Sequence, residues 1–152
     1  MHKDISLSLY KKIHAAMPIP CVDAVVVQDG KTLLCKRTNE PVKGHYWLPG
    51  GRIRKGETLT EAILRKVEQE TGLKVRIVAQ LGTEETMFDE GPFGGPTHTV
   101  NTVFLVRPVG TVDLATDDQH SDLAWFPLTA RGLHPYVAKY LRAAKRYNET
   151  KR

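Results

Sequence analysis

Residues 51–73 read GRIRKGETLTEAILRKVEQETGL, and this stretch decides the fold. It begins with a glycine-rich turn and passes into a segment with helical spacing of apolar residues. Thr58, followed three residues later by Glu61, has the capping-box pattern that marks the start of a helix. Gly72 stands where helices commonly end, because glycine adopts the left-handed conformation there without steric cost. The stretch therefore predicts a glycine loop that leads directly into a helix.

The loop and the helix together form a candidate metal site. Turns made of glycine expose backbone oxygens, and the helix can direct the carboxylate of Glu70 toward the same point. Mg²⁺ prefers hard oxygen ligands and usually keeps waters and substrate phosphates as the rest of its shell. The alternative is a solvated surface helix with ordinary charges and a capping box. The preceding glycine loop and the spacing of the charged residues favour the metal site.

The spacing of the fixed residues resembles the signature of the Nudix hydrolases. That signature is glycine, five residues, glutamate, seven residues, then arginine-glutamate-apolar-any-glutamate-glutamate-any-glycine-apolar. The residues in register with it are Gly51, Glu57, Arg65, Val67, Glu70, Gly72 and Leu73. The resemblance implies an α/β fold, the Nudix α/β/α sandwich with a curved mixed β-sheet between helices. It also implies a hydrolase that uses Mg²⁺, or Mn²⁺ in its place, on a nucleoside diphosphate linked to another group.

Two positions depart from the signature. Lys66 and Gln69 stand where the signature has glutamates. Glu68 does not replace them, because at about 100° per residue it lies roughly 160° around the helix from Glu70. Lys66, one turn before Glu70, lies on the same face as that glutamate. The carboxylate cluster with which most Nudix pyrophosphohydrolases hold metals and activate water is therefore thinned.

A second resemblance, to the GDP-mannose mannosyl hydrolase branch of the family, accounts for the thinned cluster. The segments that carry it are Lys36–Asn39, Gly44–Trp47, Pro49–Arg52 and Asp117–His120. The branch implies that water attacks the anomeric carbon of GDP-mannose or GDP-glucose and releases GDP and free sugar. Two other functions stay open: pyrophosphohydrolysis of a nucleotide sugar, dinucleotide or nucleoside triphosphate, and a catalytically silent nucleotide-binding module. The absent glutamates speak against the first of these, and the retained polar residues speak against the second.

Residue by residue, the branch implies a metal site and a general base. The Gly50 carbonyl, the Glu70 carboxylate and the amide oxygen of Gln119 would hold Mg²⁺. The substrate diphosphate and water would complete the shell. His120 would be the general base, a task that suits an imidazole because it titrates near pH ~6.5. A solvent-exposed loop histidine is the alternative for His120.

The same resemblance implies catalytic roles for three arginines and a substrate contact for one aspartate. Arg37 and Arg52 match arginines that bind the diphosphate, which a guanidinium can hold bidentately. Arg65 matches an arginine that either serves the diphosphate or orients a glutamate of the signature. Asp23 matches an aspartate near the sugar, with an ordinary polar strand residue as the alternative. A histidine that the branch places in the strand after the helix has no counterpart near residues 86–87, which leaves the sugar open.

Hydrophobic periodicity and turn signals predict the remaining elements. Strands are predicted at residues 22–27, 32–36, 73–81, 99–106 and 123–126. Ile5, Leu9 and Ile13 recur at four-residue spacing, which suggests a short amphipathic N-terminal helix that ends before Pro18. Leu59, Ile63 and Val67 are predicted to line the core face of the helix after the glycine loop. A last helix opened by Pro135 has an apolar stripe formed by Val137, Tyr140, Leu141 and Ala144. Strands mixed with helices indicate a layered α/β domain.

The whole chain, residues 1–152, is predicted to form one domain. It has no run of about 18 apolar residues and no signal-like apolar start, so a cytoplasmic protein without membrane contact is expected. Cys21 and Cys35 lie in apolar runs and are predicted to be buried thiols. The net charge of +5, from 22 Lys and Arg against 17 Asp and Glu, suits phosphates but does not decide the function. No nucleic-acid partner is expected, and the family resemblance implies a homodimer.

Overall fold

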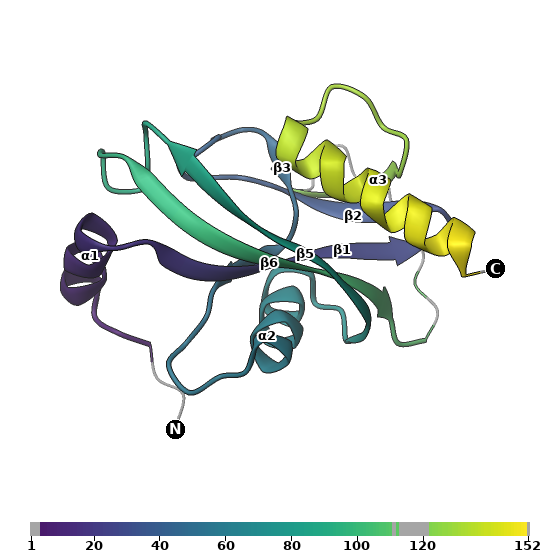
Figure 1. Ribbon diagram of the computed structural model, residues 1–152, viewed down its shortest axis with the longest axis horizontal. Coiled ribbons are helices and arrows are strands. Elements are labelled where there is room, and N and C mark those ends of the chain that lie inside the picture. The colour runs from purple at the N-terminus through teal and green to yellow at the C-terminus, as the bar shows by residue number, and fades with distance from the viewer. Residues whose placement is uncertain (1–3, 111, 113–121, 152) are drawn as a thin grey trace.

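The computed structural model describes residues 4–110, 112 and 122–151, and in these residues three helices and seven strands follow one another (Figure 1). The helices are α1 (Leu7–Ala16), α2 (Leu59–Thr71) and α3 (Pro135–Thr150). The strands are β1 (Ile19–Gln28), β2 (Lys31–Lys36), β3 (Tyr46–Trp47), β4 (Gly50–Arg52), β5 (Val75–Phe88), β6 (Thr97–Pro108) and β7 (Leu123–Pro127). The expected α/β class is confirmed.

The strands form one mixed sheet in the order β3-β2-β1-β6-β5, with β4 paired to β1 and β7 paired to β2. Only the β1–β6 pair is parallel among the described pairings, and it runs from Ile19 opposite Thr99 to Val26 opposite Val106. Strand β5 shifts register twice against β6, between Ile77 and Ala79 and between residues 80 and 82. Such irregularities bend a strand and increase its twist, which accounts for the curvature of the sheet in Figure 1.

Strand β5 is longer than the sequence predicts. The apolar pattern ends near residue 81, but the strand continues to Phe88, opposite Thr97 of β6. The added part, residues 82–88, is rich in threonine and glutamate and therefore has no apolar alternation to detect. Hydrogen bonds between threonines across the pair, such as Thr86 Oγ1 to Thr99 Oγ1 at 2.6 Å, accompany the backbone pairing there. Cross-strand pairing thus extends β5 beyond its local signal.

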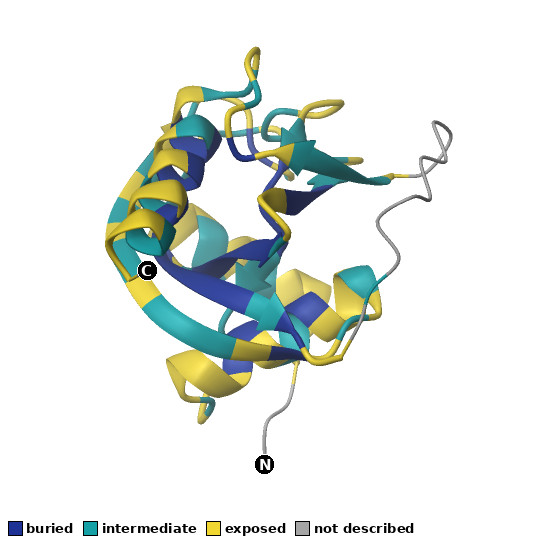
Figure 2. Ribbon diagram, turned by 90° about the vertical axis from the view of Figure 1, so that its right-hand side faces the viewer, coloured by how far each residue is buried: buried dark blue, intermediate teal, exposed yellow. Residues whose placement is uncertain are grey.

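Two apolar cores lie on the two faces of the sheet, and β1 contributes to both. Val22, Ala24 and Val26 pack with α2, whereas Val25 and Val27 pack with α3. This alternation follows from the two-residue period of a strand. Figure 1 shows α2 and α3 on opposite sides of the sheet, and Figure 2 shows the buried residues concentrated in the strands and on the helix faces that meet them. The predicted α/β/α sandwich is confirmed.

Two predicted apolar stripes are less buried than expected. Leu59 is 39% exposed, and the core face of α2 is formed instead by Ala62, Ile63 and Val67. Leu59 is the first residue of its helix, where the chain is still approaching the sheet. Helix α1 has no buried residue, and its Leu9 is 45% exposed, because α1 lies at the end of the sheet and not on either face (Figure 1).

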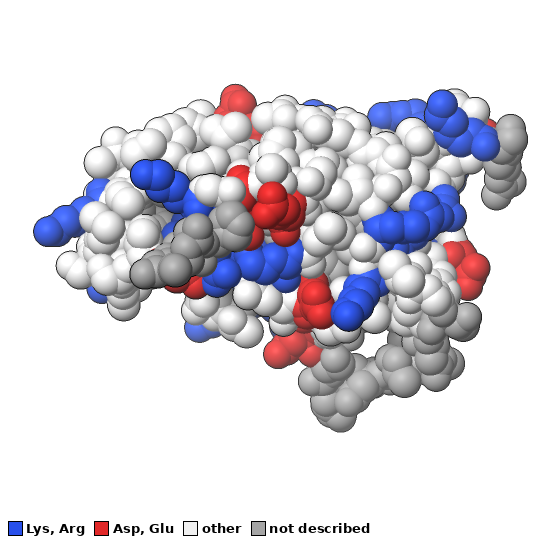
Figure 3. All heavy atoms as spheres, turned by 90° about the horizontal axis from the view of Figure 1, so that it is seen from below, with Lys and Arg blue, Asp and Glu red and all other residues white. Residues whose placement is uncertain are grey.

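The charged residues do not gather into a patch of one sign on the face shown in Figure 3. Lysine and arginine side chains alternate there with aspartates and glutamates. The net positive charge therefore does not by itself mark a binding surface on that face. Within the described part of the chain, no helix combines the length and hydropathy that crossing a bilayer requires.

Candidate active site

One cavity of about 470 Å³ brings together most of the residues that the sequence singled out. The predicted site residues in its wall are Asp23, Arg37, Gly50, Arg52 and Glu70. They come from β1, from the loop after β2, from β4 and from the end of α2. Gln119 and His120 lie outside the residues that the structure describes, so their predicted roles as metal ligand and general base stay predictions.

Gly50 connects the glycine loop to both the sheet and the helix. Its backbone N–H donates a hydrogen bond to Oε2 of Glu70 at 3.1 Å, and its Cα pairs with that of Asp23 across β1 and β4. A Cβ at position 50 would lie 2.1 Å from the carbonyl oxygen of Val22. Only glycine therefore allows the loop to lie this close to β1.

Asp23 is a buried carboxylate in the cavity wall. The residue is 6% exposed, and its Oδ2 accepts a hydrogen bond from the Tyr136 hydroxyl at 2.6 Å. Burial raises the pKa of Asp23 to about 7, and the negative charge of Glu70 adds to the rise. The Tyr136 hydrogen bond and the charge of Arg37 oppose it. Asp23 can therefore exist in either protonation state near neutral pH. Its predicted contact with the sugar stays a prediction.

The two arginines predicted to bind the diphosphate both line the cavity. Arg37 donates from Nε to the carbonyl oxygen of Pro41 at 2.7 Å, which fixes the direction of its guanidinium. Arg52 lies over the ring of Tyr10, with 4.5 Å between the guanidinium carbon and the ring centroid. It also pairs with Asp4 at 3.2 Å. Both arginines are held by neighbours and keep other donors for an anionic ligand.

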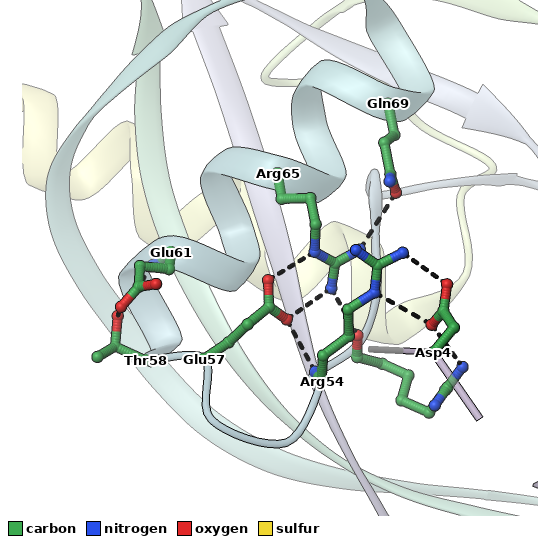
Figure 4. A network of polar contacts seen from close by, with 8 residues as sticks. Asp4, Arg54, Glu57, Thr58, Glu61, Arg65 and Gln69 are labelled. Carbon is green, nitrogen blue, oxygen red and sulfur yellow. Dashed lines mark hydrogen bonds and ion pairs between the residues drawn. The ribbon is translucent and has the colours of Figure 1, made fainter. Parts of the chain in front are cut away.

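Arg65, in contrast, does not line the cavity. Its Nε and one terminal nitrogen donate to the two oxygens of Glu57 at 2.6 and 2.8 Å, and the same terminal nitrogen donates to the carbonyl of Arg52 at 3.1 Å. The backbone N–H of Arg54 also donates to Glu57, at 2.8 Å. Figure 4 shows this network, which ties the glycine loop to α2. Of the two roles left open for Arg65, these contacts favour the one that orients a glutamate of the signature.

The start of α2 has the predicted cap. The Thr58 side chain accepts a hydrogen bond from the backbone N–H of Glu61 at 3.1 Å, and the Thr58 hydroxyl donates to the Glu61 carboxylate at 3.0 Å (Figure 4). At the other end, Gly72 has φ of 76°, the left-handed conformation that glycine adopts most readily. Local sequence alone therefore sets both ends of the helix that carries Glu70.

Replacing Arg65 with methionine should destabilise the fold by about 3 kcal/mol at pH 7, because the buried carboxylate of Glu57 would lose its partner. The Glu57 side chain is 3% exposed, and the hydrogen bond from Arg65 is the main reason that its pKa falls to about 2. A depressed acid pKa stabilises the fold above the unfolded value, and this contribution is lost as the pH falls toward the folded value. Urea unfolding at pH 7 and pH 3 should therefore give a larger loss at pH 7.

The matched control for this measurement is Arg142→Met, which removes an exposed arginine from α3. That change should alter the free energy of unfolding by no more than about 0.5 kcal/mol. An equal loss for Arg65→Met at both pH values would show that the ion pair with Glu57 is not what stabilises the loop.

The described residues fit a single divalent ion better than a cluster of ions. Glu70 is the one signature carboxylate in the cavity wall, because Glu57 is engaged by Arg65. No group of three or more His, Cys, Asp or Glu side chains suited to a metal occurs among the described residues. Mg²⁺ is often held by one or two carboxylates together with substrate phosphates. Glu70 and the Gly50 carbonyl can supply the protein's share of such a shell.

Several residues of the cavity wall were not predicted from the sequence. Tyr136 from α3 and Tyr10 and His14 from α1 all line it. The ring nitrogen Nε2 of His14 lies 2.8 Å from the Thr97 hydroxyl, a contact that attaches α1 to β6. The only sequence signal for Tyr136 was its place beside the predicted apolar stripe of the last helix, which suggests packing and not a polar contact.

Both cysteines also lie in the cavity wall, which corrects the expectation that they are simply buried. Cys21 and Cys35 are partly exposed and free. Desolvation nevertheless raises the pKa of each thiol to about 12. Since the thiolate is the reactive form, neither cysteine is a suitable nucleophile near neutral pH.

Comparison with known proteins shows which family and which proteins the chain is similar to. The profile of the NUDIX domain matches residues 17–146. The chain is 40% identical over 136 residues to the low-salt glycan biosynthesis protein Agl8 of Haloferax volcanii, covering 88% of this chain and 86% of that protein. It is 35% identical over 129 residues to the ADP-ribose pyrophosphatase of Methanocaldococcus jannaschii, covering 82% and 74%.

Among solved structures, the fold resembles a crystal structure of a MutT NUDIX hydrolase from Burkholderia pseudomallei. The TM-score is 0.67 at 28% sequence identity, and the match covers 84% of this chain and 98% of that one. The overall fold of the chain is therefore shared with that structure.

Proposed function

The chain belongs to the Nudix hydrolase family, and on that premise we propose that it hydrolyses a nucleoside diphosphate joined to a sugar, cleaving within the diphosphate. One observation carries the proposal: a single cavity combines two arginines, Arg37 and Arg52, with the carboxylate of Glu70. The arginines suit the oxyanions of a diphosphate. The carboxylate suits a divalent ion shared with the same phosphates.

The names of two relatives support this class of substrate. One relative is an ADP-ribose pyrophosphatase, and ADP-ribose is itself a nucleoside diphosphate joined to a sugar. The other is named for glycan biosynthesis, a process that consumes activated sugars. A nucleotide sugar is a class of compound consistent with both names and with the two arginines of the cavity.

The residues of the cavity have separate tasks in this reaction. Arg37 and Arg52 would bind and orient the diphosphate, and they would stabilise charge on the phosphate that leaves. Mg²⁺ or Mn²⁺ would be held by Glu70 and the Gly50 carbonyl, and it would neutralise charge on the phosphates. Arg65 and Glu57 would keep the glycine loop in place beside α2.

A second candidate is hydrolysis at the anomeric carbon, with release of GDP from GDP-mannose or GDP-glucose. The observation that favours it concerns Lys66 and Gln69, the two residues that depart from the signature. Lys66 pairs with Glu70, and the Gln69 amide oxygen accepts a hydrogen bond from Arg65 at 3.2 Å. Neither side chain can supply the extra carboxylates that pyrophosphohydrolases use to activate water. In this case His120 would be the base and Gln119 a third metal ligand.

Hydrolysis in ¹⁸O-labelled water separates the two candidates, with ADP-ribose and GDP-mannose as substrates and Mg²⁺ present. Cleavage within the diphosphate should place the label in a phosphate group of one product, and mass spectrometry of the products detects it. Label in the free sugar, with an unlabelled nucleoside diphosphate, would establish attack on carbon. Absence of any product from a panel of nucleotide sugars would reject both and leave a nucleotide-binding module.

The homodimer implied by the family resemblance belongs to the same proposal. Light scattering of the purified chain should give a mass of about twice 17.0 kDa. A monomeric mass at working concentration would remove the dimer without affecting the assignment of the cavity.

A further inference from the structure

A lysine stands beside Glu70 at a position where the Nudix signature has a glutamate. We propose that Lys66 is a tethered cation that neutralises Glu70 and limits the cavity to at most one weakly bound divalent ion. The functional meaning of this inference rests on the proposed hydrolysis in the same cavity. The ion binding that it predicts can be measured without turnover.

The geometry places the lysine ammonium at the carboxylate. Nζ of Lys66 lies 3.5 Å from Oε1 of Glu70, one helical turn along α2, and the Lys66 side chain is only 21% exposed. The other oxygen of Glu70 accepts the hydrogen bond from Gly50. Both oxygens of the carboxylate therefore already have a donor from the protein, and any metal must share them.

The stem of the lysine is packed against the glycine loop. A Cβ placed on Gly51 would lie 2.6 Å from Cε and 3.1 Å from Nζ of Lys66. Gly51 itself lines the cavity. The ammonium is therefore held directly behind the cavity wall, and the side chain is not free to turn away into solvent on that side.

The positive charge of Lys66 acts on residues that line the cavity. Burial dominates the pKa of Cys21 and of Cys35 and raises both, but the positive charge of Lys66 opposes the rise at each thiol. Both thiols line the cavity. An ammonium that acts on two separate cavity residues will also repel a divalent cation and attract a diphosphate.

The net charge on this face of α2 explains why Lys66 should change the binding of divalent cations strongly. Lys66, Gln69 and Glu70 together carry no net charge at neutral pH, whereas three glutamates would carry three negative charges. A cluster of carboxylates needs several cations before it can accept a diphosphate. The formally neutral arrangement can accept the diphosphate with one cation or fewer, because the ammonium of Lys66 already lies beside Glu70.

Binding of Mn²⁺ alone tests the inference, since the electron paramagnetic resonance signal of free Mn²⁺ gives the number of bound ions and their affinity. The wild-type chain should bind at most one ion weakly. Lys66→Met removes the charge and keeps the apolar stem, and it should tighten Mn²⁺ binding by on the order of tenfold. The double variant Lys66→Glu, Gln69→Glu should bind a second ion. Glu70→Gln should lose the wild-type ion.

Lys74→Met is the matched control, because it makes the same change as Lys66→Met at an exposed residue that does not line the cavity. Its Mn²⁺ binding should equal that of the wild type. Circular dichroism checks that each variant is folded, and Lys66→Met alone decides the matter if the double variant does not fold. Mn²⁺ affinity of Lys66→Met equal to that of the wild type would overturn the inference, whether or not any nucleotide sugar is hydrolysed.

Discussion

Replacing Glu70 with glutamine should reduce Mg²⁺-dependent turnover of a nucleotide sugar by about a hundredfold or more, since residues that only support a metal site already account for about 10–100-fold. Glu70 is the one signature carboxylate in the cavity wall among the described residues. The amide keeps the size of the side chain and can still accept the hydrogen bond from Gly50. The fold should therefore persist, and only the charge at the metal position is removed.

The measurement is steady-state hydrolysis of ADP-ribose and GDP-mannose over a range of Mg²⁺ concentrations, together with thermal unfolding of each variant. Glu68→Gln is the matched control, since it makes the same chemical change on α2 at an exposed residue outside the cavity wall. Its turnover should stay close to that of the wild type. Near-normal activity of Glu70→Gln with a normal fold would show that the metal is not bound at this carboxylate.

Replacing Asp23 with asparagine should stabilise the metal-free protein at pH 8 and impair catalysis. Asp23 is 6% exposed, and burial is the main reason that its pKa rises to about 7. At pH 8 the fold must therefore hold a buried charge. Raising the pKa of Asp23 from 3.8 to about 7 corresponds to roughly 4 kcal/mol. This is an upper bound for the gain, because the asparagine NH₂ group also needs partners. A gain of about 1–4 kcal/mol is expected.

The pH dependence of the free energy of unfolding shows whether the buried charge of Asp23 causes the expected gain. An acid whose pKa is raised on folding binds its proton more tightly in the folded state, so the stability that it contributes falls as the pH rises. For Asp23 the fall runs from its ordinary value of 3.8 to about 7. Urea unfolding in EDTA should show that the advantage of Asp23→Asn is absent near pH 4 and complete by pH 8. The pKa of Glu57 is instead lowered on folding, from 4.5 to about 2, so the stability that Glu57 contributes changes only below pH 4.5. The two effects therefore overlap only near pH 4.

A conservative change elsewhere in the same contact provides the control. Tyr136→Phe removes the hydroxyl that donates to Asp23 and leaves the ring in the core. It should raise the pKa of Asp23 further and destabilise the fold, most strongly at pH 8. If Asp23→Asn lowers the free energy of unfolding at every pH, the surroundings of Asp23 stabilise its carboxylate. The buried charge would then not reduce the stability of the fold.

The local sequence was sufficient to predict the elements whose structure depends on residues close by in the chain. The cap at Thr58, the left-handed end at Gly72 and the glycine loop before the helix are each produced by a few consecutive residues. The strands near the centre of the sheet were predicted for a related reason. Their apolar residues are on both faces, so a run of buried side chains is visible whatever the partner strand is.

The far half of β5 and the exposure of α1 could not be predicted in this way. Residues 82–88 form a strand because β6 lies beside them, and their own side chains give no apolar alternation. Leu9 is apolar and helical, but the sheet offers no face for it to cover. In both cases the neighbouring part of the fold, and not the segment's own sequence, decides whether the segment forms a strand or is buried.

For the site, the sequence by itself determined the half of the cavity that carries Glu70: the spacing from Gly51 to Glu70 places the loop and the carboxylate together, because one turn and one helix connect them. Only the tertiary structure decided the other half. Tyr136 meets Asp23 across 113 positions of sequence, and His14 meets Thr97 across 83. The raised pKa of Asp23 exists only once α3 and β4 close over it and remove water. Desolvation is a property of the whole fold, so no local pattern could have revealed it.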